Sequence, residues 1–479
     1  MKKFLALSLL IIFMLASCAR PTSHSDIRFA IAQAPINLDP RYATDASSER
    51  INRLIYRQLI DFDEASKPKP DLAEWQKIGP TQYRFFLKQE GRVFHDGSSV
   101  SAEDVAATYG SLLALKDSPH AAEFANIRQV KVLDANTLDF YLKQPDEDFV
   151  SRLIVGILPA RLIVSGYDFS HRPLGSGSFK FLSWNGAVRL ERISDHQLFS
   201  IEEVKDPTVR VLKLIRGEVD LLQGDLPPEL VNYIKSKPEL AVLENKGSNF
   251  SYLGFNMQDE ILKNMLVRQA VAHAIDRQAI IEKALVAGSR QAGAILPPEH
   301  WAGNANLIAY DYNPKLSREL LAQAGVKLPL KLVYKTSTDA QRVRLATILQ
   351  AQMREAGIEL EIHSLDWGTF FDDIKHGKFQ LYGLTWVGIK TPEIYRLAFH
   401  SQSTPPNGAN RGRYADAELD QMIDGRDWPA ATTRIHQQLP YIPLWYEGQF
   451  AAIRHGLLNY ELKPDGNWDG LATISKHEN

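Results

Sequence analysis

The chain carries the sequence FHDG at residues 94–97, followed by SAEDV at residues 101–105. Asp-Gly pairs favour tight turns, so we predict a turn at Asp96-Gly97. Ser101 can cap free backbone amides, and Asp104 stands three residues later, which is a capping-box pattern for the start of a helix. The residues at helical spacing that would form its buried face are Val105, Tyr109, Leu112 and Leu113.

Segments typical of strands and of helices alternate on both sides of this stretch. Strand-like patterns occur at residues 27–31, 83–87 and 138–142. Helical spacing occurs at residues 45–59, 264–275 and 342–356, and Asp276 can cap one more helix. Residues 402–412 are rich in Pro and Gly and predict an exposed loop. The alternation predicts an α/β protein.

Further short motifs follow one another along the chain. They are Asn37-Leu38-Asp39-Pro40, Gly175-Ser176-Gly177-Ser178-Phe179, Gly217-Glu218-Val219-Asp220, Phe255-Asn256, Val267-Arg268-Gln269-Ala270 and Ala274-Ile275-Asp276-Arg277. Together with the two motifs above, they resemble the solute-binding proteins of bacterial peptide and nickel ABC importers, known as solute-binding protein family 5. Turns and helix caps also explain each motif, so we interpret them as marks of the fold rather than of the ligand.

The resemblance implies an α/β fold of the type II periplasmic-binding-protein class. This is a bilobed clamp with an extra α/β domain inserted in the first lobe. By analogy, lobe one would hold residues 26–46, 160–257 and 446–479, the inserted domain residues 47–159, and lobe two residues 258–445. Ligand would lie between lobes that close by hinge bending, and would act by favouring the closed form.

The resemblance also suggests where a ligand would bind. In peptide-binding relatives, a lobe-two segment Trp-x-x-Asp pairs its Asp with the peptide α-amine, while its backbone pairs with the peptide as an added strand would. The corresponding residues here are Trp386, Val387, Gly388 and Ile389, so the position of the acid is apolar. A buried ammonium without a carboxylate is costly, so we expect ligands that are neutral, capped or apolar at this point. Lys390, next in the chain, could favour an anion.

Other candidate ligand contacts have structural alternatives. Trp386 could form a cleft wall or could pack in the core. Tyr252 and Asn256 lie on or just after a predicted strand that leaves lobe one, and Asn256 could instead satisfy hinge backbone groups. Pro35, in the segment before the Leu-Asp-Pro motif, could lie at the cleft edge.

Cys18 is the single cysteine of the chain, and it follows a signal-like N-terminus. Lys2 and Lys3 precede an apolar run from Phe4 to Leu15, which is too short to span a membrane. The ending Leu-Ala-Ser-Cys resembles a bacterial lipobox, the alternative being an ordinary cleaved signal. We therefore predict a signal peptide at residues 1–17, acylation of Cys18, and a tether at residues 18–25.

The composition excludes several function classes. Loss of Lys2 and Lys3 moves the formal net charge from −2 to −4, which gives no basic surface for nucleic acid. A lone cysteine rules out disulfides within the chain. Common catalytic and nucleotide-binding motifs are missing, and the thirteen histidines form no close pair, so we expect no catalysis, cofactor or metal. A nickel or haem site built from distant histidines stays open.

These observations predict the substrate-binding lipoprotein of an ABC importer, which captures a peptide or peptide-like solute. We expect a monomer, anchored by its lipid in the cell envelope outside the cytoplasm, that docks on a permease driven by an ATPase. The rival interpretation is an envelope lipoprotein that uses the same clamp as a sensor or assembly partner. A secreted hydrolase is a more distant alternative.

Overall fold

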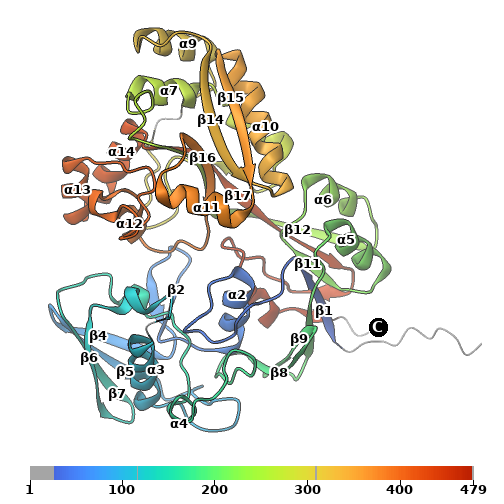
Figure 1. Cartoon of the computed structure of the whole chain (residues 1–479). Coiled ribbons are helices and arrows are strands. Elements are labelled where there is room, and N and C mark those ends of the chain that lie inside the picture. The colour runs from blue at the N-terminus through green and yellow to red at the C-terminus, as the bar shows by residue number, and fades with distance from the viewer. Residues whose placement is uncertain (1–25, 116, 308–309, 477–479) are drawn as a thin grey trace, which may run out of the picture.

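The computed structural model describes residues 26–115, 117–307 and 310–476. The chain forms two lobes, with helices α7 and α9 to α14 in the upper lobe and α2 and α3 in the lower one (Figure 1). Cys18, the predicted signal peptide and the tether lie outside the described residues. The bilobed α/β fold predicted from the sequence is confirmed.

One large sheet runs through both lobes. Its strand order is β15-β14-β16-β12-β17-β11-β1-β10-β9-β8, and β13 pairs with β17 at the side. The strands are β1 (Ile27–Ile31), β8 (Phe179–Asn185), β9 (Ala187–Arg192), β10 (Leu198–Glu203), β11 (Leu221–Gln223), β12 (Leu240–Phe255), β13 (Arg290–Gln291), β14 (Leu330–Ser337), β15 (Ile358–Leu365), β16 (Leu381–Trp386) and β17 (Tyr441–Arg454). The two long strands β12 and β17 pair antiparallel and join the lobes, so they form the connection about which the lobes can move.

Lobe two is built around the β15-β14-β16 end of this sheet, where the pairings of β14 are parallel. Its helices are α7 (Met265–His273), α8 (Arg277–Ala284), α9 (Pro314–Gln323), α10 (Ala340–Glu355), α11 (Trp367–His376), α12 (Glu393–Phe399), α13 (Ala417–Asp424) and α14 (Trp428–Gln438), with a 3-10 turn at Ser401–Ser403. Leu345, Leu349 and Met353 of α10 are buried in the lobe-two core, as their helical spacing predicted. The predicted loop at residues 402–412 has no regular structure after Ser403.

The inserted segment has its own sheet and core. A four-stranded antiparallel sheet, in the order β4-β5-β7-β6, packs against α3. Its elements are β2 (Ile60–Phe62), β3 (Pro68–Pro70), β4 (Ala73–Gly79), β5 (Gln82–Leu87), α3 (Ala102–Ala114), β6 (Ile127–Asp134), β7 (Thr137–Leu142) and 3-10 turns at Ala121–Phe124 and Val150–Arg152. The predicted capping box is confirmed, with the Ser101 amide 2.7 Å from Asp104 Oδ2. Asp104 Oδ1 also accepts from the amide of Ala160, 2.7 Å away, which ties α3 to the chain returning to lobe one.

Lobe one holds the other end of the large sheet. Its remaining elements are α2 (Ala46–Ile55), α4 (Ala160–Val164), α5 (Pro207–Arg216), α6 (Pro228–Lys235), β18 (Leu457–Leu458), β19 (Ser475–Lys476) and a 3-10 turn at Asp469–Ala472. Ile51, Leu54 and Ile55 of α2 pack with the lobe-one strands, whereas the core of the inserted segment begins at Leu59 and ends at Ile157. We therefore propose that the inserted domain comprises about residues 58–157.

Two of the sequence motifs meet where α2 ends. The amide of Gly177 donates to the carbonyl of Ile55 at 2.7 Å, and Tyr56 then turns the chain into extended backbone. The helix predicted to reach residue 59 therefore ends at Ile55. His95, from the FHDG motif, lies 3.0 Å by its Nε2 from the Gly177 carbonyl. A Cβ at Gly177 would lie 2.3 Å from the carbonyl oxygen of Leu54, so only glycine permits this approach.

Candidate functional site

A cavity of about 1060 Å³ lies between the lobes, and we call it the interlobe cavity. Lobe one contributes the C-terminal end of α2 and the segment 461–469. The inserted domain contributes residues 61–71, and the joining strand β12 contributes residues 245–248. Lobe two contributes Arg290, Pro297, Glu299, His300, Ile389 and Lys390. Its volume is slightly above the range of about 300–1,000 Å³ that is usual for small-molecule sites.

Ile389 is the predicted ligand contact that reaches this cavity. The chain leaves β16 at Trp386 and passes Val387, which is 51% exposed. It then turns at Gly388, which has a φ of +70°. Asn249 of β12 accepts from the Gly388 amide at 3.4 Å. This turn directs Ile389 and Lys390 to the cavity. An apolar side chain therefore stands where peptide-binding relatives are expected to carry an acid.

Trp386 and Tyr252 lie in a different place. They line a small pocket of about 20 Å³ within lobe two, together with Tyr382, Phe399 and Tyr441. The rings of Trp386 and Tyr252 stack at a centroid distance of 6.5 Å. A void of this size holds at most a water molecule, so both aromatic side chains act in lobe packing. Between the two alternatives for Trp386, this placement favours the core.

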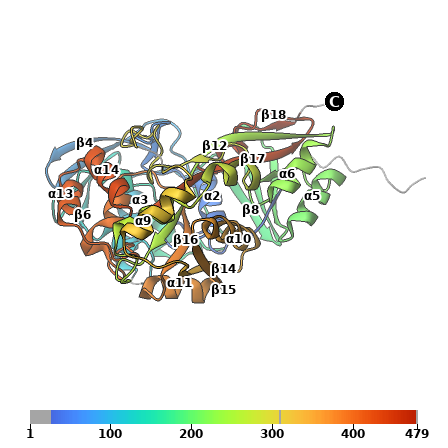
Figure 2. The same ribbon diagram turned by 90° about the horizontal axis from the view of Figure 1, so that it is seen from above.

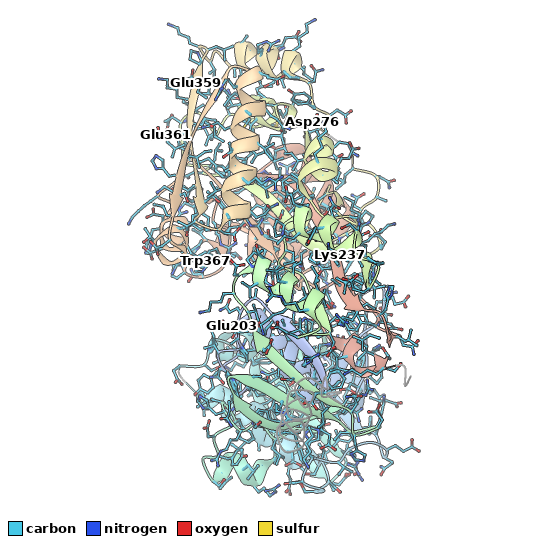
Figure 3. The ribbon with its side chains drawn as sticks, turned by 90° about the vertical axis from the view of Figure 1, so that its right-hand side faces the viewer. Glu203, Lys237, Asp276, Glu359, Glu361 and Trp367 are labelled. Atoms are coloured by element: carbon cyan, nitrogen blue, oxygen red, sulfur yellow. The ribbon has the colours of Figure 1, made fainter. Side chains whose placement is uncertain are left out.

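Arg411 links this packed group to the edge of lobe two. Its guanidinium lies 4.6 Å from the ring centroid of Trp386 and 5.4 Å from that of Phe371. Phe371 in turn stacks on Trp367 at 5.4 Å. Figure 3 shows Trp367 at the lower edge of the upper lobe, with Glu203 of lobe one below it. Stacked planar groups of this kind stiffen the lobe-two wall.

Asn256 and Pro35 also have structural partners. The Asn256 side chain is buried and donates to the carbonyls of Gly377 and Phe379, at 3.1 and 2.8 Å. Pro35 is buried, and the following amide of Ile36 donates to Ser48 Oγ at 2.9 Å. Neither residue lines the interlobe cavity. Their roles as ligand contacts stay predictions.

An ion pair between the lobes crosses the cavity. Lys390 Nζ of lobe two contacts Asp465 Oδ2 of lobe one, and both residues line the cavity. Burial alone would raise the pKa of Asp465, but the charge of Lys390 and hydrogen bonds from Lys390 and Asn467 lower it below the usual value. The ammonium of Lys390 is therefore already paired with a carboxylate of this chain. This pairing argues against the prediction that Lys390 binds an anionic ligand.

His300 fixes the backbone beside this pair. Its Nε2 donates to the Lys390 carbonyl at 2.9 Å, while its Nδ1 accepts from the Ala302 amide at 2.9 Å. Burial lowers the pKa of His300, which keeps the imidazole neutral near pH 7. Neither Asp465 nor His300 was predicted from the sequence. Asp465-Gly466 is a turn pair, which would have been the one local signal for the acid.

The remaining charges of the lining are largely paired with one another. Arg53 bonds to Asp469 at 2.8 Å and to Asp61 at 2.9 Å. Arg57 pairs with Asp71, and Arg290 pairs with Glu299. A lining of mutually neutralised pairs supplies many donors and acceptors without a strong net field, which suits a polar solute of low net charge.

Among residues 26–115, 117–307 and 310–476, no group of three or more His, Cys, Asp and Glu side chains is placed to hold a metal ion. No helix in the described ranges is both long enough and apolar enough to span a membrane.

Comparison with known proteins agrees with this architecture. Residues 67–407 match the model of the bacterial extracellular solute-binding proteins, family 5 middle region. The chain is 25% identical to heme-binding protein A of Haemophilus influenzae, over 95% of this chain and 93% of the relative. It is 24% identical to the oligopeptide-binding protein AppA of Bacillus subtilis, over 94% and 91%.

A solved structure shares the fold. The substrate-binding protein CtaP of Listeria monocytogenes superimposes with a TM-score of 0.84 at 22% sequence identity, covering 95% of this chain and 99% of that one. The motifs, the bilobed architecture and the family match over most of the chain agree with one another. The chain therefore belongs to the bacterial extracellular solute-binding proteins of family 5.

Proposed function

We propose that this protein captures a peptide or peptide-like solute in the interlobe cavity. As a family 5 solute-binding protein, it is the substrate-binding component of an ABC importer. The observation that carries the ligand class is the cavity itself, which is large, is lined by charged and apolar side chains, and is built from both lobes and the inserted domain. A solute that spans such a cavity must offer several hydrogen-bonding groups, as a short chain of peptide units does.

Ligand capture would work by closure. Groups from both lobes line the cavity, so a solute that contacts both lobes binds the closed arrangement better than an open one. The closed complex would then dock on a membrane permease whose ATPase drives transport. Cys18 and the preceding signal support export and a lipid anchor, which would keep the clamp beside that permease.

Native mass spectrometry of the freshly purified protein tests this proposal. We expect a bound solute with peptide-type mass and fragments, released unchanged on unfolding. Small-angle scattering of the emptied protein should then show a smaller radius once this solute is returned. Recovery of a hydrolysed product, or a radius that does not respond to the returned solute, would contradict a binding clamp.

A further inference from the structure

Asp465 is the most deeply placed acid of the interlobe cavity. Its side chain is 12% exposed, whereas Asp61, Asp71 and Asp469 are 26–29% exposed. Two donors of Asn467 hold its carboxylate, the backbone amide at 3.0 Å from Oδ1 and the side-chain amide at 2.8 Å from Oδ2. A carboxylate that is buried, oriented and hydrogen-bonded in this way is a site ready to receive an ammonium group.

The chain fills that site with its own ammonium. Lys390 reaches Asp465 from the opposite lobe, one residue after Ile389, which stands at the expected position of the amine-binding acid. Its backbone is fixed by His300, so the side chain starts from a defined point. Lys390 therefore enters the cavity from the segment that is expected to bind a ligand amine.

The other carboxylates that line the cavity are poor binding sites for a ligand amine. Arg53 occupies Asp61 and Asp469, and Arg57 occupies Asp71 with two bonds, at 2.9 and 2.7 Å. The side chain of Glu299 is 57% exposed and paired with Arg290, and that of Glu461 is 61% exposed and paired with Lys463. Asp63 and Glu64 are exposed. Exposed carboxylates bind an ammonium weakly because water competes.

We propose that the ammonium group of Lys390 occupies a position at Asp465 where a ligand amine could otherwise bind. The cavity then selects solutes that carry no positive charge where they approach Asp465. This inference rests on the function proposed above and deepens it. The ligand class becomes amine-free peptide-like compounds, such as N-acylated peptides. The same ion pair joins the lobes, so a ligand amine that displaced Lys390 would weaken closure as it bound.

Chemical rescue tests the proposal. Lys390→Ala removes three methylene groups and the ammonium, which together are an n-propylammonium ion. Titration calorimetry on the full mature protein should show that Lys390→Ala binds n-propylammonium about tenfold or more tightly than the unmodified protein does. Lys390→Met, which fills the same volume without charge, should show no gain, and Lys390→Ala/Asp465→Asn should lose the gain of the single variant.

A second experiment, with peptides, tests whether this site determines which ligands bind. Lys390→Ala should gain thermal stabilisation by tri-alanine that N-acetylation of the peptide removes, while the unmodified protein gains none. Lys390→Ser replaces the alanine variant should that one fail to fold. The inference is overturned if Lys390→Ala binds propylammonium no better than Lys390→Met, or if the unmodified protein responds to tri-alanine through its amine. These readouts report the Asp465 site itself, so they stay decisive even if mass spectrometry finds no bound solute and the proposed function fails.

Discussion

Arg426 of lobe two holds both carboxylate oxygens of Asp148 in the inserted domain, at 2.5 and 2.6 Å. Seen from above, α13 and α14, which flank Arg426, lie over the strands of the inserted domain (Figure 2). On the other side of the molecule, Arg344 of α10 pairs with Glu229 of α6 at 2.6 Å. Together with the Lys390–Asp465 pair, these contacts join lobe two to lobe one and to the inserted domain.

Loss of Arg426 should therefore favour opening. Arg426→Gln leaves the Asp148 side chain, which is 7% exposed, without its cation. Because Arg426 is itself a third exposed, we expect the closed form to weaken by about 1–2 kcal/mol. Small-angle scattering without ligand should show a larger radius for this variant. Arg216→Gln, which alters an exposed pair within lobe one, is the matched control, and an equal change in both variants would contradict an interlobe role.

Glu393 should make this contact depend on pH. Burial first, and then a hydrogen bond and the charge of Asp148, raise the pKa of Glu393 to about 7, against the opposing charges of Arg396 and Arg152. Arg426 also interacts with Glu393 through charge, and Glu147 in turn interacts with Arg426. A raised carboxyl pKa means that the assembled state binds a proton more tightly, so its stability falls as pH rises from about 4.5 to about 7.

The substitution Glu393→Gln isolates this effect. Thermal unfolding should show the variant about 1 kcal/mol more stable than the unmodified protein at pH 8, and about equally stable at pH 4.5. Subtracting the two profiles removes the contributions of all other titrating groups. A difference that does not vary between pH 4.5 and pH 8 would show that Glu393 titrates normally.

Gly177→Ala should damage the junction between α2 and the inserted domain. The new Cβ would meet the carbonyl of Leu54 at 2.3 Å and the carbonyl carbon of Ile55 at 2.6 Å, and backbone cannot move aside cheaply. We expect a loss of about 1–3 kcal/mol in the free energy of unfolding. Gly79→Ala is the control because nothing lies within 4 Å of its Cβ position, and its effect should stay within about 0.5 kcal/mol.

Asp104→Ala should destabilise the inserted domain more than Glu103→Ala does. Asp104 is 8% exposed, and its loss removes the acceptor for the amides of Ser101 and Ala160. Two half-buried donors left without their acceptor should cost about 1–2 kcal/mol in denaturant unfolding. Glu103→Ala changes an exposed acid in the same first turn, so a comparable loss in that variant would refute the capping argument.

Plain peptides should not stabilise the protein if Ile389 has removed the usual amine contact. Saturation at about 100 times the Kd would add about 2.7 kcal/mol, which a thermal-shift assay detects easily. We therefore expect no shift with di- to pentapeptides that carry free amines. Clear stabilisation by a tripeptide that disappears when its amine is capped would disprove this expectation.

The local motifs could be predicted from sequence because each is a short-range physical pattern. The capping box at Ser101 and Asp104, the strand at residues 27–31 and the buried face of α10 depend on neighbours a few residues away. The end of α2 could not be predicted in this way. Its last carbonyl is bonded by Gly177, more than one hundred residues later, so the helix stops before its apolar pattern does.

The features of the candidate site also differ in whether the sequence could predict them. The family, the bilobed α/β clamp and the presence of Ile389 where an acid is expected could be predicted from the sequence, because they follow from the identity and order of residues. The three-dimensional fold was needed to show that Trp386 and Tyr252 pack together in lobe two while Ile389, which also touches this core, and Lys390 line the cavity. The turn at Gly388 sets those directions. The fold also decided the pairing of Lys390 with Asp465, which are far apart in the chain and meet because β12 and β17 bring the two lobes together.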